Sequence, residues 1–136
     1  MGELPECVKQ FSVALPSNNI ERAEDLLKQN SGLIQEKTDF GNWVHLAIRF
    51  RYFNVIEFLI SRGVGISELD AYGRNALTLV ACTGDFEAFK LIYALGAPID
   101  TETALRNPLF SAIDSKSLVI VKFLVEEALM SSGAIR

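Results

Sequence analysis

Three side chains in this sequence are candidates for catalysis or metal binding: the lone histidine, His45, and two cysteines, Cys7 and Cys82. As a general base, His45 would need a serine or cysteine nucleophile in a triad-type arrangement, and the sequence shows no such signature beside it. A zinc site takes about four ligands, more than one histidine and two distant cysteines supply. A reactive thiol needs a neighbour that stabilises the thiolate, and the sequence around Cys82 shows none. We therefore predict a chain that is not an enzyme and uses no metal or cofactor; catalysis by His45 or Cys82 is the less favoured alternative.

The residues around His45 recur along the chain, first at a spacing of 33 positions and then of 32. The recurring blocks are His45-Leu46-Ala47 with Thr78-Leu79-Val80, Gly63 with Gly96, and Lys90-Leu91-Ile92 with Lys122-Phe123-Leu124. A unit of this length cannot bury its own apolar face, so it must stack on neighbours, and about three or more units are needed for a stable core. The repeat therefore predicts one repetitive domain over residues 1–136.

Each unit has the pattern of a turn, a short helix, a tight loop and a longer helix. The first helices are expected to start at three asparagines that share one column of the repeat, Asn42, Asn75 and Asn107. Asparagine caps a helix N-terminus because its side chain accepts a hydrogen bond from a backbone N–H that has no partner in the helix. Pro108 then stands at the first helical position, where its missing N–H costs nothing.

The second helices are expected over residues 53–62, 86–95 and 118–127, where apolar residues recur in a helical rhythm. Asp85 and Ser117 are the expected N-caps of two of them, and Gly84 is expected to let one loop turn tightly. Gly63 and Gly96 follow the ends of two second helices, the position where a left-handed residue commonly terminates a helix.

These columns resemble the ankyrin repeat, whose pattern runs roughly Gly-x-Thr-Pro-Leu-His-x-Ala, then a Gly loop, an apolar helix and Gly-Ala. The matching residues are Gly73-Arg74-Asn75-Ala76-Leu77-Thr78, Ala81, Gly84 and Gly96-Ala97 in the third unit, Val44-His45-Leu46-Ala47 and Gly63 in the second, and Asn107-Pro108-Leu109 and Ala112 in the fourth. No unit has the complete Thr-Pro-Leu-His. A tetratricopeptide array is the nearest alternative, but it lacks this Gly-turn-Asn column. The expected units span about 6–37, 38–69, 70–101 and 102–136.

The resemblance implies an all-α solenoid of ankyrin-type helix–turn–helix units, with a concave groove lined by the turns and first helices. It also implies a non-catalytic protein–protein interaction module, a binding or scaffold protein. His45 falls in the family's structural histidine column, which implies a buried, hydrogen-bonding side chain. A self-associating assembly subunit is the alternative function.

Composition narrows the function further. The net charge of −4 argues against nucleic-acid binding, which draws on a broad basic face. No apolar run approaches the ~18–20 residues that span a membrane, and residues 1–10 have no signal-peptide pattern. Two cysteines are too few for a disulfide framework, so reduced thiols in the cytoplasm are expected, with the nucleus as the alternative.

In the family, the columns before the capping asparagine and at the end of the first helix face the groove. They give the expected partner-binding residues: Phe40, Trp43, Arg49, Phe50, Tyr72, Arg74, Cys82, Thr83, Arg106 and Asp114. Aromatic residues and arginine are the types enriched at binding hot spots. Phe50 is the sharpest candidate because its column otherwise holds the polar Thr83 and Ser115. The alternative is that Phe50 and Trp43 fold down onto their own helices.

Two further expectations concern charge and the C-terminal unit. Arg74 and Arg106 share a column and would lie roughly 10 Å apart in adjacent stacked units, the usual spacing of packed helices. Surface arginines are usually only solvated, which is the favoured interpretation; the alternative is that with Arg49 they form a basic stripe suited to an acidic segment of a partner. In the fourth unit Val119 replaces the polar residues of its column, which predicts that this end packs on its own tail or on another chain.

Overall fold

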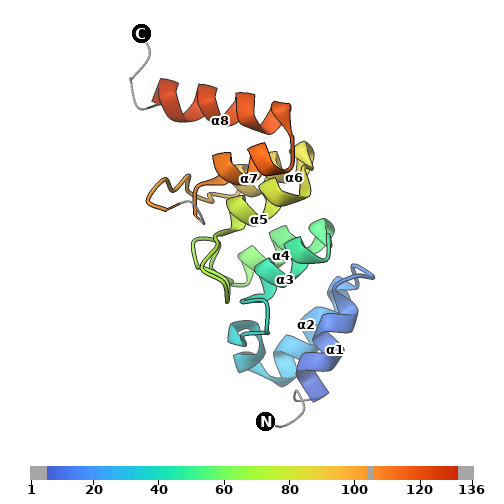
Figure 1. Cartoon of the computed structure of the whole chain (residues 1–136). Coiled ribbons are helices and arrows are strands. Elements are labelled where there is room, and N and C mark those ends of the chain that lie inside the picture. The colour runs from blue at the N-terminus through green and yellow to red at the C-terminus, as the bar shows by residue number, and fades with distance from the viewer. Residues whose placement is uncertain (1–5, 104–105, 132–136) are drawn as a thin grey trace. The chain divides into compact units, whose positions relative to one another are not determined.

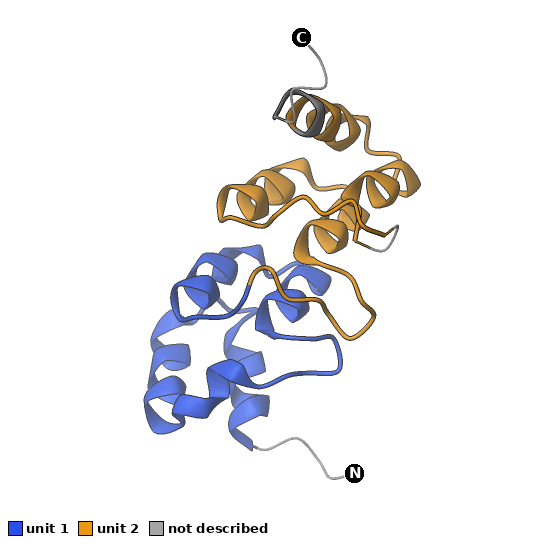
Figure 2. Ribbon diagram, turned by 90° about the vertical axis from the view of Figure 1, so that its left-hand side faces the viewer, with its two compact units in different colours: residues 1–65 blue, residues 66–136 orange. Residues whose placement is uncertain are grey.

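The computed structural model describes residues 6–103 and 106–131, which form helices joined by turns (Figure 1). Within these residues no β-strand occurs, and an isolated bridge joins Thr38 to Gly41. The predicted all-α fold is therefore confirmed. Backbone contacts divide the chain into two compact units, unit 1 over residues 1–65 and unit 2 over residues 66–136 (Figure 2).

Unit 1 comprises α1 (Glu6–Ala14), α2 (Ile20–Gln29), η1 (Ser31–Gln35), α3 (Trp43–Arg49), η2 (Phe53–Val55) and α4 (Ile56–Ser61). Its core includes an edge-to-face pair of rings, Phe11 and Trp43, whose centroids are 4.7 Å apart. At the surface, Arg62 at the end of α4 forms an ion pair with Glu24 of α2. The first helix pair is thereby connected to the second.

Unit 2 comprises α5 (Ala76–Thr83), α6 (Phe86–Ala94), α7 (Pro108–Asp114) and α8 (Leu118–Ser131). Phe123 of α8 lies edge-on to Phe86, Phe89 and Tyr93 of α6, with ring centroids 5.8, 5.8 and 5.4 Å away. The Tyr93 hydroxyl donates a hydrogen bond of 3.1 Å to Glu127 Oε2. Desolvation raises the pKa of Tyr93 above its usual value, and the hydrogen bond and negative charge of Glu127 raise it further. Aromatic packing therefore joins the two second helices of this unit.

The predicted N-caps of the first helices are confirmed. The side-chain oxygens of Asn42, Asn75 and Asn107 accept hydrogen bonds from backbone N–H groups in the first turns of α3, α5 and α7. Pro108 occupies the first turn of α7 as expected. Each asparagine satisfies N–H groups that the helix itself cannot pair.

The second helices differ from the predicted ranges where capping differs. Asp85 caps α6 through a 3.0 Å bond from the Ala88 N–H, and α6 matches its predicted range closely. Tyr52 stands at the equivalent position before residue 53 and makes no side-chain cap, and the first turn there is the 3-10 helix η2. The expected cap Ser117 accepts only a long 3.5 Å bond from the Ile120 N–H, and α8 extends past its predicted end to Ser131.

The loop between the helices of each pair contains one residue with left-handed backbone geometry. These residues are Asn18, Arg51, Gly84 and Lys116, with φ of 53°, 64°, 73° and 60°. They are spaced 33, 33 and 32 positions apart and so occupy one column of the repeat. The predicted tight turn at Gly84 is confirmed, and the same turn recurs where the sequence carries a side chain. Left-handed geometry favours glycine, so Arg51 and Lys116 hold it against their intrinsic preference.

Candidate protein-binding surface

His45 is buried in a capping box at the start of α3. Asn42 Oδ1 accepts hydrogen bonds from the N–H groups of Val44 and His45, at 2.9 and 3.1 Å. In return, His45 Nδ1 accepts the Asn42 backbone N–H at 3.0 Å. With an exposed fraction of 1%, the imidazole is positioned to order the helix start rather than to meet a substrate. The predicted structural role of His45 is confirmed.

The cysteines lie in different surroundings and form no disulfide. Cys82 is exposed at the end of α5, whereas Cys7 is half-buried and its sulfur accepts a 3.2 Å contact from Asn30 Nδ2. Over residues 6–103 and 106–131, no three His, Cys, Asp or Glu side chains gather into a group that could hold a metal ion.

Trp43 does not lie on the surface, and its predicted place among the partner-binding residues is wrong. Its exposed fraction is 0%, its ring packs on Phe11, and its Nε1–H donates a 2.8 Å hydrogen bond to the Leu33 carbonyl. The indole thus fills the core of unit 1. Its column offers a signal for this, because Ala76 and Pro108 occupy the same position and are also buried.

The other predicted residues of unit 1 come together at the turn before α3 and the end of α3. The Arg49 guanidinium lies over the Phe40 ring, 4.9 Å from its centroid. Phe50 meets Phe40 edge-on at 5.2 Å and stacks on Tyr52 at 5.9 Å. We call Phe40, Arg49, Phe50 and Tyr52 the Arg–aromatic cluster. Phe50 is 47% exposed, so this cluster presents apolar rings and a positive charge to solvent together.

In unit 2 the predicted residues Tyr72 and Arg74 lie on a turn organised by Asp70. Asp70 is nearly buried, and its Oδ1 accepts the backbone N–H groups of Tyr72 and Arg74 at 2.9 and 2.8 Å. The turn leaves Tyr72 57% exposed and Arg74 half-buried. Tyr72 is therefore held on an ordered backbone with its ring accessible.

The predicted residues at the helix ends of unit 2 differ in accessibility. Cys82 and Asp114 are exposed. Thr83 is half-buried, and its hydroxyl donates to the Val80 carbonyl at 2.6 Å and accepts the Asp85 N–H at 3.1 Å. The Thr83 hydroxyl therefore has a local role in closing the loop between α5 and α6.

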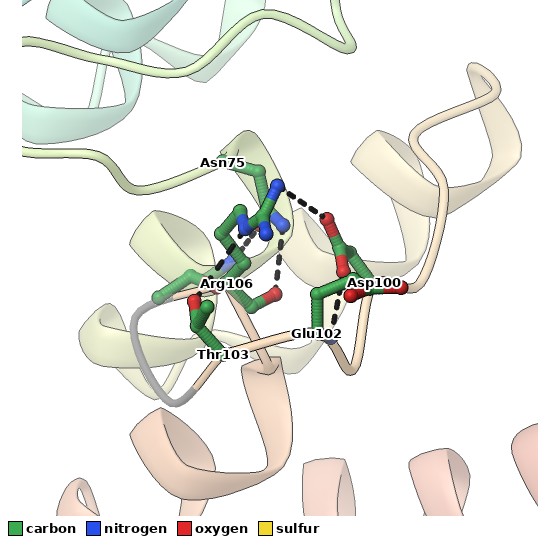
Figure 3. A network of polar contacts seen from close by, with 6 residues as sticks. Asn75, Asp100, Glu102, Thr103 and Arg106 are labelled. Atoms are coloured by element: carbon green, nitrogen blue, oxygen red, sulfur yellow. Dashed lines mark hydrogen bonds and ion pairs between the residues drawn. The ribbon is translucent and has the colours of Figure 1, made fainter.

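Arg106 lies in a network of polar contacts at the turn before α7 (Figure 3). Its guanidinium forms a 3.5 Å ion pair with Asp100 and a 3.4 Å contact with the Thr103 hydroxyl. Its backbone carbonyl accepts a 2.7 Å bond from Asn75 Nδ2. An arginine paired in this way offers less free charge to an acidic partner than the predicted basic stripe requires.

The family model of ankyrin repeats, in three copies, matches residues 44–132. The chain belongs to the ankyrin-repeat family. It is also 30% identical over 84 residues to alpha-latroinsectotoxin-Lt1a of Latrodectus tredecimguttatus. That match covers 61% of this chain and 6% of the toxin, so the chain spans a small part of its relative's length.

The last ankyrin repeat exposes columns that the repeat before it buries. On α5, Thr78 and Ala81 are buried, and the Ser115 hydroxyl after α7 donates a 2.9 Å bond to the Ala81 carbonyl. Their counterparts on α7 are Phe110 and Ile113, 52% and 54% exposed. On α8 the exposed apolar residues are Leu118, Val119 and Val125. We call these five residues the outer face of the last repeat.

Sequence reasoning missed several surface residues for an identifiable reason. Arg51 and Tyr52 follow Phe50 in the loop, beyond the helix-end columns that the family resemblance assigns to the groove. Comparison of Phe110 with the buried Thr78 of its column would have indicated part of the outer face. No described helix of this ankyrin-repeat chain is both long and apolar enough to cross a membrane.

Proposed function

We propose that the chain is a non-catalytic binding protein that recognises another protein through the turns and first-helix ends of its ankyrin repeats. Ankyrin repeats are generally protein–protein interaction modules. The observation that carries the proposal is the Arg–aromatic cluster, because it combines the exposed ring of Phe50 and two half-buried rings with an exposed arginine. Aromatic residues and arginine are among the side chains enriched at hot spots. In unit 2 the proposed surface includes Tyr72, Arg74, Cys82, Thr83, Arg106 and Asp114.

Truncation of the exposed rings tests this proposal. A partner is first captured from the native source, and its affinity for purified variants is then measured by biolayer interferometry. Phe50→Ala and Tyr72→Ala are expected to weaken binding by about 1–3 kcal/mol each, because rigid aromatic anchors dominate such interfaces. Their melting temperatures are expected to change little, since both rings are substantially exposed.

Glu57→Ala on α4 is the matched control, since Glu57 is exposed on a second helix. It is expected to bind as the unaltered chain does. Normal binding by the Phe50 and Tyr72 variants, together with lost binding by the Glu57 variant, would place the interface on the second helices and contradict the proposal.

The proposed compartment is the cytoplasm or the nucleus. There the chain is proposed to act as a scaffold for its partner protein. Both thiols are free, as is usual for proteins in a reducing compartment. Fractionation of the source cells, followed by immunodetection, tests this. Recovery only from a secretory compartment would contradict it.

Self-association is a second candidate function, favoured by the outer face of the last repeat. Phe110, Ile113 and Leu118 are exposed although the matching columns of the preceding repeat contact neighbouring helices. An exposed apolar face of this kind favours a contact with another protein surface, for which a second copy of the chain is the candidate. Light scattering over a range of concentrations tests this, with Ile113→Glu as the variant expected to remain monomeric. A strict monomer at every concentration would exclude self-association.

A further inference from the structure

The arginines at the Arg–aromatic cluster have no carboxylate partner within the described part of the chain. Arg49 and Arg51 form no ion pair there, and the nearest acidic residues on either side in sequence, Asp39 and Glu57, pair with neither. Arg106, by contrast, pairs with Asp100. In a chain of net charge −4, an aromatic surface with two unneutralised arginines favours a negatively charged partner and disfavours a basic one.

The guanidinium of Arg49 contacts a ring but makes no hydrogen bond or ion pair within the described residues. Its carbon lies over the Phe40 ring, 4.9 Å from the centroid. The N–H donors of a guanidinium form a planar fork that matches a carboxylate. Phe50 and Tyr52 extend the apolar surface next to this charge. The arrangement fits an extended segment that carries a carboxylate beside an apolar side chain.

Arg51 adds a second, independent observation. It lies between Phe50 and Tyr52 with a φ of 64°, in the column where the next repeat has Gly84. A Cβ built on Gly84 would meet no atom within 4 Å, so the penalty in that glycine's loop is backbone geometry rather than crowding. Lys116 has the same geometry in its own loop, so the fold sets the backbone, and what is particular to Arg51 is an exposed basic side chain between two aromatic residues.

We propose that the Arg–aromatic cluster and Arg51 bind an extended acidic peptide segment of a partner protein. Aspartate or glutamate side chains of the segment pair with Arg49 and Arg51, and an adjacent apolar side chain packs on Phe50 and Tyr52. The inference rests on the proposed protein-binding function and adds the chemistry of the partner. Because the charges are exposed, binding weakens as salt concentration rises.

The probe is a random peptide library displayed on phage and selected on the full chain. The selected peptides are expected to be enriched in aspartate and glutamate next to an apolar residue. The most enriched peptide is then synthesised in two forms, with its acidic side chains intact and with each converted to the corresponding amide. The amide form is expected to bind at least about tenfold more weakly, since charge-assisted hydrogen bonds are lost.

Arg51→Gly and Lys116→Gly form a matched pair of variants. Both remove a basic side chain from the same left-handed column, so both chains are expected to melt at or above the unaltered temperature. Only Arg51→Gly is expected to lose affinity for the acidic peptide, by about tenfold. The parallel gain in stability rules out unfolding as the cause of lost binding.

The outcomes separate the partner chemistry from the binding surface. Peptides that Phe50→Ala weakens, but that lack acidic enrichment or bind Arg51→Gly normally, overturn the acidic-segment inference and leave the proposed function standing. A selection that yields no peptide sensitive to Phe50→Ala overturns both at this surface. Peptides that are rich in acidic residues and sensitive to Phe50→Ala and Arg51→Gly, but not to Lys116→Gly, support both.

Discussion

At the scale of single residues, two buried polar side chains in one column of the repeat, His45 and Thr78, differ in their hydrogen bonding. His45 fills its position with an imidazole whose Nδ1 accepts the backbone N–H of Asn42. Thr78 occupies the same column in the next repeat, and its buried hydroxyl has no hydrogen-bond partner within the described residues. The first side chain contributes a hydrogen bond, whereas the second carries a desolvation cost.

Removing the imidazole is expected to destabilise the fold without any loss of a chemical activity. His45→Ala leaves the Asn42 N–H unpaired and opens a cavity, so the free energy of unfolding is expected to fall by about 2–4 kcal/mol. Urea denaturation followed by circular dichroism measures this. Cys82→Ala at an exposed position serves as the control and is expected to stay within about 0.5 kcal/mol of the unaltered chain. An unchanged midpoint for His45→Ala would contradict the capping role.

Replacing Thr78 by valine is expected to have the opposite sign. Valine keeps the shape and β-branching of threonine but has no hydroxyl, so Thr78→Val is expected to raise the free energy of unfolding by about 1 kcal/mol. Thr83→Val is the matched comparison and is expected to lower it, because the Thr83 hydroxyl makes two hydrogen bonds. A Thr78→Val chain less stable than the unaltered one would show that the hydroxyl is satisfied in solution.

At the scale of elements, the helix starts could be predicted and the loops between paired helices only in part. The helix starts can be predicted from three N-cap residues, Asn42, Asn75 and Asn107, because capping is a local interaction that depends on the residue type. The left-handed turn could be predicted at Gly84 but not at Arg51, whose residue type rarely adopts a positive φ. There the fold imposes a geometry that the local sequence disfavours.

At the left-handed positions of the loops, glycine is expected to be more stabilising than other residues, whereas within a helix it is usually destabilising. Gly84→Ala is expected to lower the free energy of unfolding by about 1 kcal/mol, because alanine disfavours a φ of 73° even where its Cβ has space. Lys116→Gly is expected to raise it by about 0.5–1 kcal/mol for the converse reason. Urea midpoints of the two variants check this. If Gly84→Ala instead raised the free energy of unfolding and Lys116→Gly lowered it, the loops would have to adopt another conformation.

The exposure of the proposed binding residues can be predicted from the sequence only as far as the repeat columns report side-chain direction. The sequence indicates an exposed Phe50, because an aromatic residue among polar counterparts has no packing explanation, and the structure agrees. For Trp43 the prediction is wrong, because this residue follows the capping Asn42 and the first turn of α3 directs its ring into the core against Phe11. The pairing of Arg106 with Asp100 cannot be predicted in this way, because it depends on a turn whose course the sequence does not specify.

At the scale of the whole molecule, the single domain with units at about 6–37, 38–69, 70–101 and 102–136 stays a prediction, since the structure describes two compact units. Trp43 offers a direct test, because the lone tryptophan is buried in unit 1 whereas circular dichroism reports on every helix. If the repeats form one domain, the fluorescence and circular dichroism transitions in urea are expected to coincide. Separate midpoints would show that the two units unfold independently.

The amide of Asn75 has a consequence for the ageing of the protein. Its Oδ1 accepts the Thr78 N–H at 2.9 Å, while its Nδ2 donates to the Arg106 carbonyl at 2.7 Å. Deamidation converts asparagine to aspartate, which keeps the acceptor but replaces the donor with a carboxylate oxygen. The helix start would remain capped, and the new charge would suit the helix dipole. The carboxylate would, however, face the Arg106 carbonyl oxygen, so a deamidated sample would keep its helical spectrum while the turn before α7 loosens.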